Sequence, residues 1–263
     1  MRVAVRPPAV AGTFYPGDPA TLRNRIRSLV AAAPRISGPP PKALIVPHAG
    51  YPYSGPIAAS AYATLRPVHG TVTRVILVGP AHFVAFSGMA LPGCAALATP
   101  LGDVPVDTDG EAFAAAHPTV AINRAAHAAE HSLETQLPFL QETLEAFSVV
   151  ALLTGDVAAA DVTAVLSDLY GGPETLFVVS SDLSHYHDYD TAGRIDAATA
   201  SSIESLQATD IGPDRACGAT GVKALLALAD QRGLRPHTVD LRNSGDTAGE
   251  KSRVVGYGAF VFD

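Results

Sequence analysis

Three short apolar runs in this chain each end a few residues before a histidine, and this arrangement constrains the fold more than any other feature. The runs and their histidines are residues 43–46 with His48, 75–78 with His82, and 176–179 with His185. Short, wholly apolar runs are typical of strands that are buried on both faces, as in a parallel sheet. Ligands of α/β proteins bind at the carboxyl edge of such a sheet, so we predict that the three histidines share one site there.

Helical periodicity occupies most of the sequence between the predicted strands. We predict helices at residues 21–32, 54–66, 111–116, 131–146, 161–170, 191–206 and 221–231, and further strands at 87–91, 104–106, 149–153, 237–241 and 254–262. Strands that alternate with helices predict an α/β fold with a largely parallel central sheet and helices on both faces. No internal repeat or long linker interrupts the pattern, so residues 1–263 are predicted to form a single domain.

The charge balance limits the classes of partner. The chain has 25 acidic and 18 basic residues, a net charge of −7, and no basic cluster, which argues against nucleic acid and membrane surfaces. No apolar run approaches the ~20 residues of a membrane span, and the N-terminal stretch has no signal-peptide core. We therefore expect a cytoplasmic protein. The two cysteines, Cys94 and Cys217, are too few for a disulfide framework.

The histidines are candidate metal ligands. Imidazole is a common nitrogen ligand, and two histidines with a carboxylate form the facial site of non-haem Fe(II) enzymes. His48 and His82 occupy equivalent positions after their strands, although either one could simply be a packed, hydrogen-bonded side chain. Asp182 precedes His185 by three residues, which places both side chains on one side of a turn. Asp182 could orient a histidine, act as a base, bind metal or cap a turn.

Three other motifs leave alternatives open. The sequence HAAEH, residues 127–131, matches the H-x-x-E-H pattern of a zinc protease class, with His127 and His131 as ligands and Glu130 as base. With nine histidines in the chain a chance match is common, and Glu130 could instead lie near a helix N-terminus. Cys217 precedes a predicted helix, where a thiol is suited to metal or redox chemistry, or it is a small buried residue. Residues 245–252, GDTAGEKS, lack the glycine that a phosphate loop has before its lysine.

Seven motifs in order resemble the Memo (mediator of cell motility) family over essentially the whole chain. They are PAVAGTFYPGDP (8–19), PHAGYPYSG (47–55), GPAHF (79–83), EHSLE (130–134), SSDLSHY (180–186), ACG (216–218) and SGDTAGEKSRVVGYGA (244–259). Prokaryotic members of that family are described as protein B of the AmmeMemoRadiSam system, beside a radical-SAM protein and an AMMECR-type protein. The resemblance implies an α/β fold like that of the LigB-type class III extradiol dioxygenases, which use Fe²⁺.

The resemblance also implies roles for particular residues. It implies metal ligands at His48, His82 and Cys217, an acid/base histidine at His185 with Asp182 beside it, and a pocket residue at His131. The class III enzymes have a glutamate where this sequence has a cysteine, and a thiolate is a softer ligand. The resemblance therefore implies a dioxygenase-like pocket more directly than it implies ring opening.

Two hypotheses of function follow. The first is a metal-binding, non-haem iron protein that oxidises a small chelating or aromatic molecule, or acts with radical-SAM and AMMECR-type partners; another divalent metal would also fit. The second is a non-catalytic module that binds a peptide or other ligand in the same pocket. Retention of metal on purification, in a manner that depends on His48, would distinguish the first hypothesis from the second.

Overall fold

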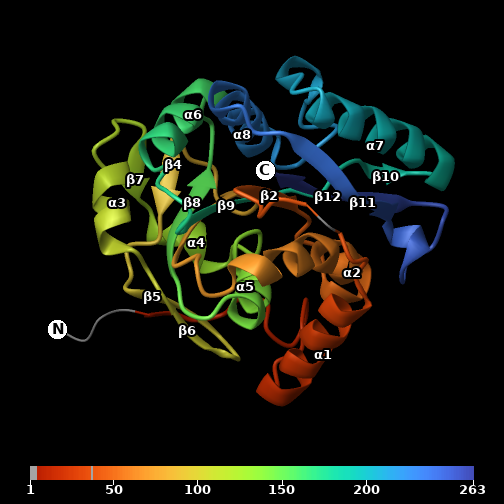
Figure 1. The fold of residues 1–263 in the computed structure, drawn as a ribbon, viewed down its shortest axis with the longest axis horizontal. Coiled ribbons are helices and arrows are strands. Elements are labelled where there is room, and N and C mark those ends of the chain that lie inside the picture. Colours follow the sequence, from red (N-terminus) through yellow and green to blue (C-terminus); the bar gives the residue numbers. More distant parts are fainter. Residues whose placement is uncertain (1–4, 37) are drawn as a thin grey trace.

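The structure is a computed structural model that describes residues 5–36 and 38–263. Its strands are β1 (Val5–Arg6), β2 (Ala43–Val46), β3 (Arg74–Pro80), β4 (Met89–Leu91), β5 (Ala96–Thr99), β6 (Gly102–Pro105), β7 (Val120–Ile122), β8 (Ser148–Thr154), β9 (Thr175–Ser180), β10 (His185–His187), β11 (Pro236–Asn243) and β12 (Val254–Phe262). Nine of them form the central sheet in the order β10-β12-β2-β9-β3-β8-β4-β7, with β11 paired to β12. A small second sheet has the order β1-β5-β6 (Figure 1).

The middle of the central sheet is parallel. Strands β2, β9, β3 and β8 are parallel neighbours, with Val46 opposite Ser180 and Val78 opposite Val179. The flanking pairs β12–β2 and β4–β8 are antiparallel, as are β10–β12 and β11–β12. The prediction of a largely parallel sheet is confirmed for its centre. The carboxyl ends of β2, β3 and β9 therefore meet at one edge.

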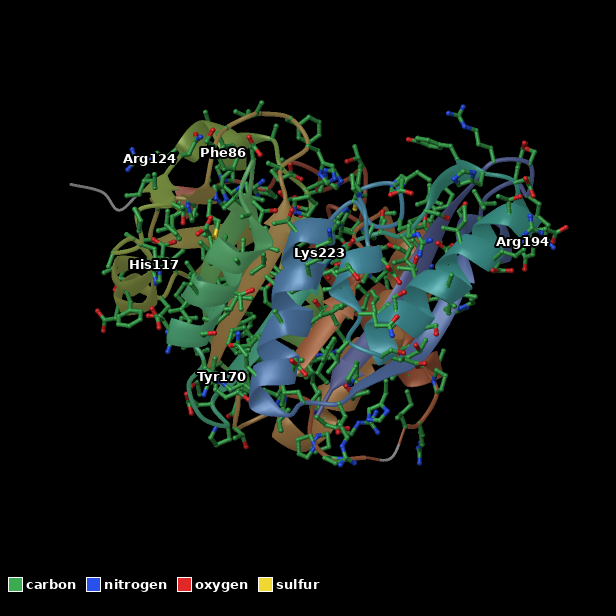
Figure 2. The ribbon with its side chains drawn as sticks, turned by 90° about the horizontal axis from the view of Figure 1, so that it is seen from above. Phe86, His117, Arg124, Tyr170, Arg194 and Lys223 are labelled. Atoms are coloured by element: carbon green, nitrogen blue, oxygen red, sulfur yellow. The ribbon has the colours of Figure 1, made fainter. Side chains whose placement is uncertain are left out.

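Helices cover both faces of this sheet. They are α1 (Pro19–Ala32), α2 (Tyr51–Tyr62), α3 (Thr108–Ala114), α4 (Arg124–Ala128), α5 (Leu137–Thr143), α6 (Ala159–Asp168), α7 (Tyr189–Glu204) and α8 (Ala219–Arg232), with short 3₁₀ turns η1 (Ala63–Val68), η2 (Glu134–Gln136), η3 (Ala208–Asp210) and η4 (Ser244–Asp246). The apolar sides of α1, α2 and α5 join one core cluster, and those of α6, α7 and α8 join the other. Figure 2 shows α7 and α8 lying across the second face.

The wholly apolar strands follow from this two-sided packing. Successive side chains of a strand point to opposite faces. In β2, Leu44 and Val46 enter the cluster with α1, α2 and α5, while Ala43 and Ile45 enter the cluster with α6, α7 and α8. All four residues are buried, so no position in the run can be polar. The described residues thus form one α/β domain around one sheet.

The predicted helix starts differ from the observed ones by two to six residues, and two of these differences have a clear physical reason. The sequence predicts a helix from His131, but the chain passes through turns and η2 before α5 begins at Leu137. Pro138 lies at the start of α5, where its missing N–H costs little; inside a helix begun at His131 it would break the hydrogen-bond ladder. Helix α2 starts at Tyr51 rather than Ser54, because Tyr51 N–H donates to Phe14 O at 2.7 Å and fixes the helix entry there.

None of the helices in residues 5–36 and 38–263 combines the length and the apolar character that a membrane-spanning helix requires.

Candidate metal centre

Three histidine rings gather at the carboxyl edge of the sheet. His48 follows β2, His82 follows β3, and His131 lies in the turn that precedes η2. Their candidate ligand nitrogens all lie within 4.8 Å of one another, the only such cluster of ligating side chains in the described part of the chain. The ring centroids are 5.1 Å apart for His48 and His82, and 4.8 Å apart for His82 and His131. His48 and His82 meet as predicted, but the third histidine of the cluster is His131 rather than the predicted His185, which lies outside it.

A hydrogen-bond chain fixes the tautomer of His48. The Ser180 hydroxyl donates to the backbone carbonyl of Ser132 at 2.6 Å, so its oxygen must accept the 2.8 Å contact from His48 Nδ1. His48 Nδ1 therefore carries the proton, and Nε2 keeps its lone pair. The ring is almost fully buried, and that burial, followed by the neighbouring His82 and His131, lowers the pKa of His48 well below its usual value. His48 is therefore held as a neutral imidazole.

Glu130 fixes His82 in the same way. Its carboxylate accepts hydrogen bonds from His82 Nδ1 at 2.9 Å, from the backbone N–H of His82, and from those of His131 and Ser132 at 2.9 Å. Burial acts to raise the pKa of Glu130, but the hydrogen bonds from His82 and Ser132 outweigh it and lower the pKa to about 2. Glu130 is thus an anion that accepts the Nδ1 proton of His82. This bond engages Nδ1 and leaves Nε2 as the ring nitrogen of His82 that could bind a metal.

His131 lies between two phenylalanine rings. Its centroid is 4.8 Å from that of Phe14 and 5.8 Å from that of Phe83, which is 61 % exposed. Burial, ahead of a smaller opposing effect of Glu130, lowers the pKa of His131. Its Nδ1 is buried, and within the described residues it has no hydrogen-bond partner. The nearest carboxylate oxygen, Glu130 Oε1, is 3.4 Å away and already accepts three other hydrogen bonds, so a metal ion or a ligand would satisfy this nitrogen.

Cys217 lies against this cluster. Its Sγ is 3.2 Å from His48 Nε2 and 3.2 Å from the backbone nitrogen of Asp182. Because the His48 proton is on Nδ1, the Cys217 thiol is the donor to Nε2. Burial, and then the nearby Asp182 carboxyl, raises the pKa of Cys217 to about 12. Sulfur and nitrogen ligands of one ion lie roughly 3.1 to 3.6 Å apart for metal–ligand bonds of about 2.3 and 2.05 Å, so this pair fits a shared ion.

Asp182 and His185 follow β9 at the same edge. The buried Asp182 carboxylate accepts the backbone N–H of His48 at 2.8 Å, so it anchors the loop that carries the first histidine. Burial raises the pKa of Asp182, against the opposing effect of the His48 N–H bond. His185 Nδ1 donates to the carbonyl of Leu183 at 2.8 Å, which leaves His185 Nε2 as a proton acceptor. The carbonyl of Leu183, rather than Asp182, thus fixes the orientation of His185.

The zinc-protease pattern does not form a site. His127 is buried, and its Nε2 lies 2.8 Å from the carbonyl of Ala90, on β4. Burial lowers the pKa of His127 to about 4, against the Ala90 bond. Its ring is outside the three-histidine cluster, and the Glu130 carboxylate accepts a hydrogen bond from His82 instead. Helix α4 ends at Ala128, so the helical face that the pattern requires is interrupted before His131.

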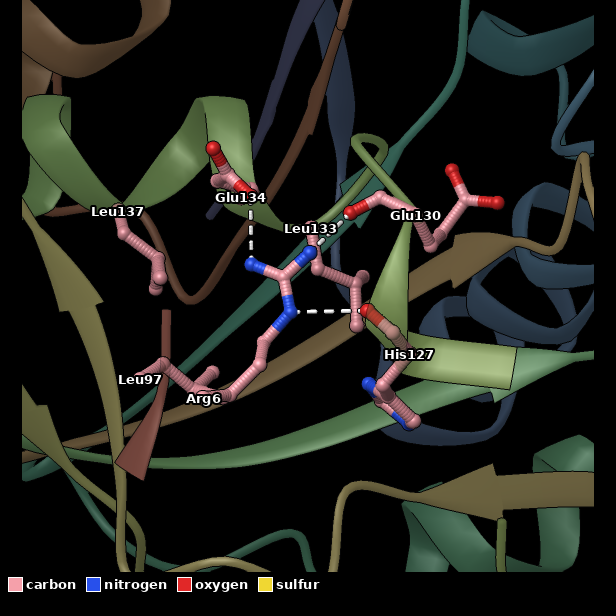
Figure 3. Close-up of a pocket in the computed structure, with 7 residues that line it drawn as sticks. All are labelled: Arg6, Leu97, His127, Glu130, Leu133, Glu134 and Leu137. Carbon is pink, nitrogen blue, oxygen red and sulfur yellow. Dashed lines mark hydrogen bonds and ion pairs between the residues drawn. The ribbon is translucent and has the colours of Figure 1, made fainter. Parts of the chain in front are cut away.

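A buried ion pair secures the N-terminal segment beside the cluster. Arg6 binds the Glu134 carboxylate and donates to the carbonyls of His127 at 2.8 Å and Glu130 at 2.6 Å (Figure 3). Glu134 also accepts the backbone N–H groups of residues 9 and 10 and the hydroxyl of Tyr15. In Figure 3 the Glu130 side chain points away from Arg6. Its carboxylate instead accepts the hydrogen bond from His82. Residues 8–19, PAVAGTFYPGDP, are therefore held beside the cluster and bring the Phe14 ring against His131. We call this segment the strap.

Sequence reasoning missed the partners that orient the ligands. From the sequence, Glu130 is a candidate protease base or a helix-terminal charge, and Ser180 belongs to the SSDLSHY motif without a role of its own. The available signal was position: Ser180 ends a buried strand, and a hydroxyl there must find a buried partner. Glu130 gave no such signal, because its contact with His82 joins residues 48 apart in the chain.

The fold and these side chains together define a class: an α/β protein with a histidine-rich candidate metal centre at the carboxyl edge of its sheet. The chain belongs to the Memo family, because the Memo-like protein family matches it over residues 6–261. It is 34% identical to a MEMO1 family protein of Sulfolobus acidocaldarius (96% of this chain, 97% of the relative) and 33% identical to one of Aquifex aeolicus (98% and 99%). A MEMO1 family protein of Methanothermobacter thermautotrophicus is 35% identical (96% and 98%).

Proposed function

We propose that this Memo family protein binds a divalent metal ion, Fe²⁺, with His48, His82 and Cys217 as ligands, and acts as a dioxygenase-like oxidoreductase. The observation that carries the proposal is that Nδ1 of His48 and of His82 each donates to a fixed acceptor, so Nε2 is the nitrogen of each ring left for a metal. Histidine ligands are oriented in this way by their outer partners. His131, with its unpaired Nδ1, lies beside them as a further ligand or as a group that contacts substrate.

The donor set decides what chemistry the metal would supply. Two imidazoles and a thiolate leave open positions on an iron ion, which would activate oxygen and bind a chelating substrate. The thiolate requires that Cys217, whose pKa is raised to about 12 by burial and Asp182, lose its proton as metal binds. Metal binding is therefore expected to release a proton and to weaken as the pH falls.

The remaining residues would handle protons and exclude water. His185, with Nδ1 bonded to Leu183 O, would accept a substrate proton at Nε2 and return it during turnover. Phe14 and Phe83 flank His131 and would give one side of the pocket an apolar surface that suits a small aromatic or chelating substrate. Radical-SAM and AMMECR-type proteins are proposed partners that would deliver or consume that substrate.

Metal content of the anaerobically purified protein, by elemental analysis, tests the ligand set. We expect near-stoichiometric iron in the wild type, and loss of iron in His48→Ala and Cys217→Ala. Cys94→Ala is the matched control, because Cys94 is also a free cysteine but donates to Ala96 O, away from the cluster. His131→Ala distinguishes a ligand, which lowers iron content, from a pocket residue, which does not. A wild type that takes up no Fe²⁺ would refute the proposal and favour a metal-free module that binds a peptide or other ligand.

A further inference from the structure

A second concave surface lies at the opposite end of the sheet from the histidines. It is a groove of about 920 Å³ between the end of α1, the turn η1, and the paired ends of β11 and β12. Val261 of β12 lines this groove, whereas Gly256 of the same strand accepts the N–H of Leu183 beside the histidine site. Five residues of strand span roughly 17 Å. The groove and the metal centre are therefore separate sites.

The charge of the groove is opposite to that of the chain. Arg35, Arg66 and Arg235 line it and, within the described residues, form no ion pair, although the chain as a whole carries a net charge of −7. The one acidic residue in the lining is Asp263, whose side-chain carboxylate lies 3.5 Å from the Nε2 of His237. Other arginines of the described residues also lack an acidic partner, among them Arg25, Arg215 and Arg253, so what distinguishes the groove is that three such arginines line one surface. The groove thus holds an excess of positive charge.

The rest of the lining is apolar and stiff. Prolines supply several wall positions, among them Pro34 and Pro67, and the aliphatic side chains include Val30, Ile36 and Val239. Proline has a fixed φ and no N–H, so these walls keep their shape and offer few backbone donors. The Thr238 hydroxyl in the lining is buried and has no hydrogen-bond partner among the described residues. Because this hydroxyl is shielded from solvent, recognition of charge in the groove depends on the guanidinium groups.

The occupant must combine apolar and anionic groups. The volume is near the upper end of the range for small-molecule sites, about 300 to 1,000 Å³, so an extended segment fills it better than a compact molecule does. Strand addition to β11 is disfavoured, because the N–H of Thr238 already donates to Glu204 Oε1 at 3.0 Å. Arginine is enriched in protein–protein interfaces and pairs with carboxylates, while aliphatic side chains pack against apolar residues. We infer that this groove is a docking site for an acidic linear segment of a partner protein.

Fluorescence anisotropy with a labelled peptide that alternates glutamate and leucine tests this inference. We expect saturable binding to the wild type, and about tenfold or greater loss of affinity in the double variant Arg66→Glu with Arg235→Glu. The control is Arg124→Glu with Arg194→Glu, which makes the same change of net charge at exposed positions outside the groove (Figure 2). It should bind within about twofold of the wild type. A peptide of lysine and leucine should not bind.

Several results would overturn the inference. Absence of binding to the wild type, or equal loss in the groove and control variants, would show that the groove has no specific role. Displacement of the peptide by inorganic pyrophosphate at similar concentrations would identify a site for small anions instead. His48→Ala should leave peptide binding unchanged. The result of this test therefore does not depend on whether the metal centre exists. The milder pair Arg66→Gln with Arg235→Gln should give an intermediate affinity, which a folding defect would not produce.

Discussion

Glu130→Gln is the substitution that most directly tests how the candidate centre is organised. The glutamate accepts four hydrogen bonds: two from His82, at the ring and the backbone, and one each from the backbone of His131 and Ser132. Glutamine has nearly the same shape but no charge, and only one of its two terminal atoms accepts hydrogen bonds. The substitution therefore leaves some of these donors without an acceptor while keeping the volume. His82 should lose its fixed tautomer and orientation.

Two magnitudes follow from these contacts. Loss of an outer partner of a metal ligand typically weakens metal binding by about 10- to 100-fold, or roughly 1.4 to 2.7 kcal/mol. The difference between a pKa of about 2 in the folded protein and the ordinary 4.5 corresponds to about 3 kcal/mol of stability. Between these two pH values the unfolded chain binds more protons. The free energy of unfolding of the wild type should therefore fall as the pH drops from about 4.5 to about 2.

The assay combines metal titration with unfolding. Competition of Fe²⁺ between the protein and a chelator gives the affinity at neutral pH, and urea unfolding of the metal-free protein across the acidic range gives the stability. Glu130→Gln should bind metal more weakly and lose the acid-dependent slope. The matched control is Glu142→Gln. This substitution removes the ion pairs that Glu142 of α5 forms with Arg23 and Arg27 of α1. If Glu130→Gln binds Fe²⁺ as tightly as the control, Glu130 does not orient His82 and the reasoning fails.

Two further substitutions separate neighbouring roles. His127→Ala should leave metal affinity unchanged and lower the free energy of unfolding by about 1 to 3 kcal/mol, since it removes the buried bond to Ala90 O; loss of metal would revive the zinc-protease hypothesis. Glu134→Gln should lower the free energy of unfolding by about 3 kcal/mol or more by breaking the buried pair with Arg6, and should expose residues 8–19 to proteolysis. Resistance to protease equal to that of the wild type would show that the strap is held by other contacts.

Much of the fold was predictable because its signals are local. The strands at residues 43–46 and 254–262 have the predicted bounds, and β3, β8 and β9 differ from prediction by one or two residues. Two-sided burial demands uninterrupted apolar runs, and such runs are visible in sequence. The helix predicted from His131 was wrong in its start, because its apolar spacing was read without the effect of Pro138. The small sheet β1-β5-β6 was not predicted, since its strands are short and partly exposed.

The sequence by itself determined the type of chain and the edge where chemistry would occur. Three strand ends carry His48, His82 and His185, and parallel strands must bring their carboxyl ends together. Only the tertiary structure decided which side chains meet there. It placed His131 in the cluster, paired Glu130 and Ser180 with the Nδ1 atoms of His82 and His48, and directed His127 to Ala90. Periodicity reports which face of an element is buried, but a contact between residues far apart in the chain depends on how the elements pack.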